Sequence, residues 1–232
     1  MFWRLHASLH AALRRRRRDK FFYEAKGKYD ARYFTGEVAT TQSIPLLMEM
    51  LAAFMGLARR ARIKPIVAHG TLIGWWWSRR LLPWDDDIDL LVTYSDLRKL
   101  RTRHGHLLGG RYLLEVNPNH VFWKTLNPTH LVHDEPNRID ARFIDTRNGL
   151  YIDIAALRQV SSGLLRTKCP HQFAASAMFP VRPAELQGVP VFVPADAEAV
   201  LRQEYGDEVL TATIFNGHRF DASDRIWKRI EE

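Results

Sequence analysis

Residues 83–92 read PWDDDIDLLV, and this stretch decides the fold because it joins four aspartates to an apolar run that favours a β-strand. Side chains alternate faces along a strand, so we expect Asp87 and Asp89 on one face with their Cα atoms roughly 6–7 Å apart. Asp85 has the same parity if the strand geometry extends back that far, whereas Asp86 points to the opposite face. The apolar residues of the run then face the core.

Carboxylates this close need a compensating positive charge, because like charges 4 Å apart repel by about 1 kcal/mol even in water. A divalent ion is the simplest source, since Mg²⁺ and Mn²⁺ prefer carboxylate oxygens. The stretch therefore predicts a metal site with Asp85, Asp87 and Asp89 as candidate ligands. A solvated acidic turn ahead of a strand is the alternative interpretation.

The composition indicates one globular domain with a full core. The chain has 232 residues, 46% hydrophobic and 26% charged, and no run of 18 apolar residues, so we predict no transmembrane helix. The net charge of +8 is compatible with a phosphate-rich substrate or a polyanionic partner. Cys169 is the only cysteine, which excludes a disulfide framework and a multi-cysteine zinc site. Cys169 and His171 could supply two metal ligands, but a structural role is favoured for such an isolated pair.

The N-terminal region carries much of the positive charge. Residues 2–13 are amphipathic and free of acids, and five arginines follow at 14–18. This order does not match a secretory signal. We expect residues 1–27 to form a basic arm, poorly ordered or an amphipathic helix, that could contact a membrane surface. A nucleic-acid partner is not favoured, because the rest of the chain is only mildly basic.

A candidate phosphate-binding turn lies upstream of the aspartates. Residues 44–62 predict a long helix, 66–68 a short strand, and His69, Gly70 and Thr71 then open a second helix. Glycine lets the backbone approach a phosphate, a threonine hydroxyl can cap the helix or bind an oxygen, and the helix N-terminus favours an anion.

The second helix carries three consecutive tryptophans, residues 75–77. They point in three directions, so at least one is expected outside the core, where Trp75 could stack on a base or sugar. Packing around the helix end is the alternative. Arg79 and Arg80 follow, and either could meet a phosphate or pair with Asp85 or Asp86.

The second half of the chain predicts further elements. A helix capped by Ser95 and Asp96 runs to about residue 106, and a strand covers 112–116. Residues 139–144 and 150–155 form a hairpin around the Asn-Gly pair at 148–149. A charge in an apolar strand is costly unless compensated, and a metal shared with Asp87 and Asp89 would compensate Asp153. We expect Asp140 and Asp145 to be turn or ion-pair residues, 189–194 to be an edge strand because of its prolines, and 195–205 to be a helix that Gly206 ends.

These motifs together resemble the LicD/fukutin family of the nucleotidyltransferase-fold superfamily. The motifs are HGTLIG at 69–74, PWDDDID at 83–89 and YIDI at 151–154. The superfamily pattern is a Gly-Ser/Thr pair opening a helix, Asp-x-Asp on the next strand, and a third carboxylate on a neighbouring strand. More narrowly, the chain resembles the fungal branch associated with mannosylphosphate transfer, in the motifs YDARYF, GWWW, IDARFID and EYGDEVL. The resemblance covers roughly residues 28–221.

The resemblance implies an α+β fold with a nucleotidyltransferase-like mixed β-sheet flanked by helices, as a single domain over 28–232 with an irregular N-terminal arm. It implies metal-dependent transfer of a phospho-sugar or phospho-alcohol, such as mannose phosphate, to a glycan hydroxyl. The donor would be nucleotide-diphosphate-linked, of the GDP-mannose or CDP-alcohol type. The compartment would be the Golgi or another secretory membrane. Zinc is not expected, because the cysteine set of the zinc-bearing fukutin-related members is missing.

The superfamily pattern matches Gly70, Thr71, Asp87, Asp89 and Asp153, and our hypothesis for the mechanism extends these roles to neighbouring residues. Asp87 and Asp89 would hold Mg²⁺ or Mn²⁺, with Asp85 as an additional ligand and Asp153 as a ligand or general base. Substrate binding would fall to His69, Gly70, Thr71, Trp75, Arg79 and Arg80.

Two other functions remain open on the sequence. One keeps the fold without catalysis, as a regulator or donor-binding subunit of glycan phosphorylation, and metal affinity without turnover would favour it. The other is an RNA nucleotidyltransferase, suggested by the basic arm, and binding of single-stranded RNA with a steep salt dependence would favour it.

Overall fold

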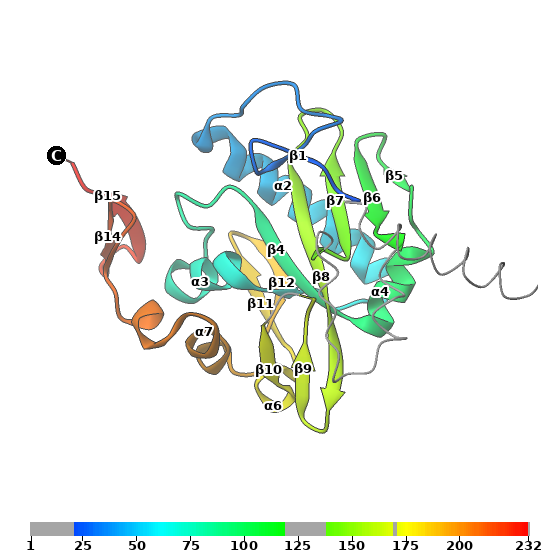
Figure 1. Ribbon diagram of the computed structural model, residues 1–232. Coiled ribbons are helices and arrows are strands. Elements are labelled where there is room, and N and C mark those ends of the chain that lie inside the picture. The colour runs from blue at the N-terminus through cyan, green and yellow to red at the C-terminus, as the bar shows by residue number, and fades with distance from the viewer. Residues whose placement is uncertain (1–20, 119–137, 169–170, 232) are drawn as a thin grey trace, which may run out of the picture.

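The computed structural model describes residues 21–118, 138–168 and 171–231. The basic run of the predicted arm and Cys169 lie outside the described residues. Those described form a single α+β domain around a large mixed sheet, as predicted (Figure 1). The strands of this sheet are β3 (Ile66–Val67), β4 (Ile88–Thr93), β5 (Leu107–Leu108), β6 (Tyr112–Val116), β7 (Ala141–Asp145), β8 (Tyr151–Ser161), β9 (Leu164–Arg166), β10 (Gln172–Ala174), β11 (Arg182–Leu186) and β12 (Val189–Val193).

The strand predicted from the aspartate-rich stretch lies inside the sheet. The strand order along the main path is β11-β12-β3-β4-β8-β7-β6-β5, and β9 and β10 branch from β8. β4 runs antiparallel to β3 and parallel to β8. Ile88, Leu90, Leu91 and Val92 are buried, so the strand contributes apolar side chains to the core as its pattern predicts.

The long helix predicted over 44–62 is α2 (Thr40–Arg60), which packs against β8 and β12. Leu47, Leu51 and Phe54 are fully buried on its inner face. Thr41–Arg60 is long and apolar enough to cross a membrane by length and composition, although no such span was predicted. In this fold the helix uses its apolar face in the core of the domain.

The Asn-Gly hairpin is confirmed, with β7 and β8 paired antiparallel. Gly149 adopts φ of +86°, and a Cβ there would lie 2.9 Å from the carbonyl oxygen of Asp30. Asp30 belongs to a second, two-stranded hairpin, β1 (Glu24–Ala25) with β2 (Tyr29–Asp30). The buried Phe22 precedes β1, so residues 21–27 pack on the domain, and the predicted boundary at residue 28 cuts through this hairpin.

The helix that follows β4 is α4 (Tyr94–Arg101), and both of its ends differ from the predicted ones. The N-cap is Thr93, whose hydroxyl oxygen accepts a hydrogen bond of 3.1 Å from the backbone N–H of Asp96. Ser95 therefore lies inside the helix, and the helix ends at Arg101 rather than near residue 106. Thr93, Ser95 and Asp96 all offer a capping oxygen, and the end of β4 selects the first of them.

The edge position predicted for 189–194 is wrong. β12 lies between β11 and β3, and β11 is the edge strand. β12 pairs with β3 only at Phe192, so Pro190 lies beyond the end of that short strand and removes no hydrogen bond from the pair. β10 and β11 were not predicted, because prolines in this region favoured a loop.

The C-terminal region adds α6 (Ala175–Met178), α7 (Ala197–Tyr205), a short 3₁₀ helix (Asp207–Leu210) and a three-stranded sheet. That sheet consists of β13 (Ile214–Phe215), β14 (His218–Asp221) and β15 (Ile226–Arg229) and lies to one side of the main sheet (Figure 1). Asp196 caps α7 and Gly206 ends it, as predicted for the end. Phe220 and Trp227 pack on Trp77, which anchors the small sheet to α3 (His69–Ser78).

Asp140 and Asp145 are ion-pair residues, as predicted. Asp145 lies 2.7 Å from the guanidinium of Arg111. Asp140 is fully buried and lies 3.0 Å from Arg158 and 3.2 Å from Lys168. Burial alone would raise the pKa of Asp140, but the positive charges of Lys168 and Arg158 outweigh it and hold the pKa at about 2.

We predict that Asp140→Asn lowers the free energy of unfolding by about 3 kcal/mol at neutral pH, because it removes the buried negative charge that lies against the buried cations Arg158 and Lys168. The pKa of Asp140 is below its ordinary value, so the difference from wild type is full above pH 3.8 and shrinks as the pH falls toward 2. Urea unfolding across this range measures it. Asp224→Asn, which removes an exposed ion pair with Lys228, is the control and should change little. An equal loss in both variants would contradict the prediction.

Candidate active site

Three carboxylates of the predicted metal site, Asp85, Asp87 and Asp89, are here called the acidic row. They lie where the chain enters β4, next to the start of β8. β4 and β8 are parallel and in register, so Asp89 is the direct cross-strand neighbour of Asp153. The structure thus brings Asp153 beside the row from a segment more than 60 residues away.

Asp86 points away from the row, as its parity predicts. Its carboxylate lies 2.8 Å from the ammonium of Lys28, in the turn between β1 and β2. The expected alternative pairing with Arg79 or Arg80 does not occur. Asp86 is therefore a surface ion-pair residue, and its pair with Lys28 connects the entry to β4 with the N-terminal hairpin.

Asp85 is the member of the acidic row with a carboxylate oxygen that lacks a hydrogen-bond partner. Its Oδ2 atom is buried and accepts no hydrogen bond. Burial raises the pKa of Asp85 to about 8, and the charges of Asp87 and Asp89 add to the shift. Gly70 makes the close packing possible, because a Cβ at that position would lie 2.7 Å from Asp85 Oδ2.

The turn before α3 is tied to β4 by two hydrogen bonds. The hydroxyl oxygen of Thr71 accepts a 3.0 Å hydrogen bond from the backbone N–H of Asp89, and the N–H of Ala68 donates to the Asp89 carbonyl. Thr71 is 1% exposed, so its side chain positions Asp89 and is not open to a ligand. Of the predicted phosphate-binding pair, Gly70 therefore has the more accessible backbone.

Asp153 has a cationic partner that the sequence analysis missed. Arg142 Nε and Nη2 donate to its two carboxylate oxygens at 2.6 and 3.1 Å. The guanidinium is buried, lies 3.5 Å from the centre of the Tyr151 ring, and also bonds Glu24 at 2.9 Å. Burial still leaves the pKa of Asp153 raised. The hairpin register pairs residues 142 and 153, so counting back from the Asn-Gly turn would have found this ion pair.

A second group missed by the sequence analysis adjoins the row. Glu204, in the last turn of α7, binds the Nδ1 atom of His69, and the Nδ1 atom of His171 lies 3.5 Å from the same carboxylate oxygen. Burial lowers the pKa of His69, but Glu204, Asp89 and Asp87 outweigh it and raise the pKa. Burial and the nearby His69 lower the pKa of His171. His69, a predicted substrate residue, is therefore also half of an ion pair.

Tyr205 extends this group toward the row. Burial of its hydroxyl, the charges of Glu204 and Asp89, and a hydrogen bond to Glu204 raise its pKa above the ordinary value. Glu204 and Tyr205 begin the EYGDEVL motif, on which the family resemblance is partly based. From the sequence we predicted only the end of a helix in this segment and assigned neither residue a role in the site.

The structure corrects the role predicted for Trp75. The Trp75 ring is 7% exposed, and the guanidinium of Arg79 lies 3.8 Å from its centre, so the ring has no open face for a base or sugar. Trp76 is the most exposed of the three tryptophans. Arg79 is used in this stack and donates to the Trp75 carbonyl at 2.7 Å. Arg80 is exposed, and its predicted contact with a phosphate stays a prediction.

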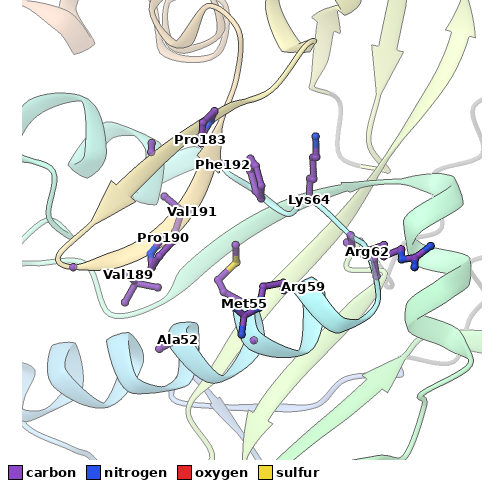
Figure 2. A pocket seen from close by; sticks show the side chains of 14 residues that line it. Ala52, Met55, Arg59, Arg62, Lys64, Pro183, Val189, Pro190, Val191 and Phe192 are labelled. Atoms are coloured by element: carbon purple, nitrogen blue, oxygen red, sulfur yellow. The ribbon is translucent and has the colours of Figure 1, made fainter.

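A cavity of about 580 Å³ lies elsewhere, between α2 and β12. Figure 2 shows Met55 and Arg59 of α2 facing Val191 and Phe192 across it. Its lining is apolar with cations at the rim and has no carboxylate. The carboxylates with raised pKa values, those of the acidic row and of Asp153, gather at β4 and β8, so we place the candidate active site there and not at this cavity.

The residues present fit a hard divalent cation. The acidic row and Asp153 offer oxygen donors from two adjacent strands, and the orphaned Asp85 Oδ2 lacks the partner that such an ion would provide. Arg142 pairs with Asp153 and Glu24 and with no carboxylate of the acidic row, so the charges of the other two members of the row still raise the pKa of Asp85.

Comparison with protein families identifies the class. The family described as LicD/FKTN/FKRP, nucleotidyltransferase domain, matches residues 62–196. This segment is more than half of the chain and contains α3, β4, β7 and β8. The chain belongs to the LicD family.

Two curated relatives come from Saccharomyces cerevisiae. Mannosyltransferase regulator 4 is 31% identical over 163 residues, which cover 62% of this chain and 13% of the relative. Mannosyltransferase regulator 14 is 36% identical over 100 residues, which cover 39% of this chain and 10% of the relative. The chain thus matches only about a tenth of the length of these fungal proteins, and the expected similarity to the fungal branch is confirmed.

We predict that, without divalent ions, the protein loses stability as the pH rises from 3.8 to about 8. The pKa values of Asp85 and Asp89 are raised to about 8 in the fold, so ionising these groups at higher pH opposes folding. Asp85→Asn should remove part of this slope and stabilise the protein at pH 8 by about 2 kcal/mol.

Urea unfolding in EDTA at about pH 5 and about pH 8 measures this effect. Asp86→Asn is the matched control, because its side chain is 41% exposed and paired with Lys28. The same pH slope in wild type and Asp85→Asn would contradict the prediction. Added Mg²⁺ should stabilise wild type most at the higher pH.

Proposed function

We propose that this protein transfers a phospho-sugar or phospho-alcohol, such as mannose phosphate, from a nucleotide-diphosphate donor to a glycan hydroxyl. The observation that carries the proposal is the buried acidic row beside Asp153, with an oxygen of Asp85 left without a partner. Membership of the LicD nucleotidyltransferase domain supports the reaction class, and the names of the fungal relatives support a role in glycan modification.

Asp87, Asp89, Asp85 and Asp153 would hold Mg²⁺ or Mn²⁺, which supplies charge neutralisation at a diphosphate and polarisation of the attacked phosphorus. The hydroxyl oxygen of Thr71 accepts a hydrogen bond from the backbone N–H of Asp89 and thereby fixes the position of Asp89. Gly70 brings the start of α3 against the row, where the helix N-terminus favours a phosphate.

Arg142 binds both oxygens of Asp153, which orients the carboxylate and favours its ionised form against the effect of burial. The lone pairs that Arg142 leaves free can accept a hydrogen bond from an acceptor hydroxyl or bind a cation. Arg142 would therefore be a positioning residue, and His69 would lie close enough to the row to meet the same diphosphate. The exposed Arg80 is a candidate contact for the leaving nucleotide.

A non-catalytic role as a regulator or donor-binding subunit of glycan phosphorylation is the second candidate. The observation in its favour is that both fungal relatives are named mannosyltransferase regulators. The complete set of carboxylates favours catalysis over this role, because a buried acidic row is costly to keep without a cation. In residues 21–118, 138–168 and 171–231 no observation favours the RNA nucleotidyltransferase.

The proposal predicts nucleoside monophosphate release from one member of a donor panel containing GDP-mannose, CDP-ribitol, CDP-choline and UDP-sugars. The assay uses Mg²⁺ or Mn²⁺, a glycan acceptor and an EDTA control, and separates nucleotides by chromatography. Release of a nucleoside diphosphate would mean glycosyl transfer and would contradict the central step. Metal and donor binding without release would favour the regulator.

Two adjacent aspartates provide a matched pair for this assay. Asp87→Asn should lower turnover by at least about a thousandfold, the order expected for losing an electrostatic contact to the transition state. Asp86→Asn should retain turnover near wild type, since Asp86 faces Lys28. Equal turnover by the Asp87→Asn and Asp86→Asn variants would contradict the assignment of the acidic row to the active site.

A further inference from the structure

His69, His171 and Glu204, here called the His-Glu cluster, come from three separate parts of the chain. His69 opens α3, His171 immediately precedes β10, and Glu204 lies in the last turn of α7. α3 contacts both α7 and β4, and Figure 1 shows α7 on the far side of α3 from β4. The two imidazole rings are 5.0 Å apart, and one ligand atom from each residue lies within 4.8 Å of the others.

We infer that the His-Glu cluster is a second metal site, which takes a divalent transition ion of the Zn²⁺ type. The inference rests on the convergence of two imidazole nitrogens and a buried carboxylate on one point. It does not depend on the proposed reaction, because it concerns binding alone.

Helix stability does not explain the position of the Glu204 carboxylate. Glu204 lies at the C-terminal end of α7, where the helix dipole disfavours a negative charge. Its side chain is 2% exposed, and its oxygen faces both Nδ1 atoms. A site for a cation accounts for a buried anion with two nitrogen donors aimed at it.

The donor set separates this site from the acidic row. Imidazole nitrogen suits zinc, copper, iron and nickel, whereas an all-carboxylate set suits magnesium and manganese. Two histidines and one glutamate leave a position of a tetrahedral zinc site open for water or substrate. The two sites can therefore hold different ions at the same time.

Solvent reaches the cluster through a cavity of about 330 Å³. His171, Gln172, Phe173, Gln203 and Glu204 line it. This cavity gives an ion an entry path and leaves room for a water ligand. His171 is 35% exposed and is the ligand nearest to solvent, so its replacement should not disturb the core.

The test is equilibrium dialysis of chelator-treated full chain against Zn²⁺ with excess Mg²⁺, followed by metal analysis. Wild type should bind stoichiometric zinc, and His171→Ala and Glu204→Gln should lower the affinity by more than about tenfold. His106→Ala, which removes an exposed histidine, is the control and should bind as wild type. Co²⁺ added to wild type should give the absorption spectrum of a tetrahedral N/O site, and this readout requires no variant.

Two results would overturn the inference. One is zinc binding by wild type no tighter than by His171→Ala, with no tetrahedral cobalt spectrum. The other is zinc binding that survives in His171→Ala but is lost in Asp87→Asn, which would place the zinc on the acidic row. Neither result bears on nucleotide release with Mg²⁺, so the proposed function can stand or fall separately.

Discussion

The structure depends on the burial of several like charges at the junction of β4 and β8. Asp85, Asp87 and Asp89 enter the fold together, and the parallel register adds Asp153. Burial raises the pKa values of all four carboxylates, and the charge of at least one neighbouring aspartate adds to each shift. A fold retains such a group only when other parts of the chain or a bound cation offset the cost.

The surrounding elements offset the free-energy cost of burying these carboxylates at some positions and not at others. Arg142 neutralises Asp153 from β7, and Thr71 pins the backbone of Asp89 from α3. Lys28 draws Asp86 outward to the surface. The Oδ2 atom of Asp85 is left without a hydrogen-bond partner, and it fills the space against Gly70 that a side chain at position 70 would need. This selective neutralisation is what distinguishes a cation site from a structural ion network such as that of Asp140.

Local patterns predicted the parts of the fold that local forces determine. The alternation in residues 83–92 predicted β4 and the direction of Asp86 away from the acidic row, and the Asn-Gly pair predicted the β7–β8 hairpin. Propensity was less informative where several residues compete for one role. Thr93 rather than Ser95 caps α4, and Pro190 lies in an interior strand because its neighbour is too short to reach it.

The remainder of the site depends on contacts between distant segments. The pairing of Arg142 with Asp153 was accessible in principle, since it follows from the hairpin register. The meeting of His69 with Glu204 was not, because 135 residues separate them and nothing in α7 marks which face turns toward α3. Burial of Trp75 under Arg79 likewise depends on how the end of α3 packs.

The central claim is that the acidic row binds a divalent cation, and a manganese titration followed by EPR of the free ion tests it most directly. The account predicts that wild type removes free Mn²⁺ from solution, that Asp86→Asn does so equally, and that Asp87→Asn binds the ion much more weakly. Equal binding by all three proteins, or no binding by wild type, would contradict the claim.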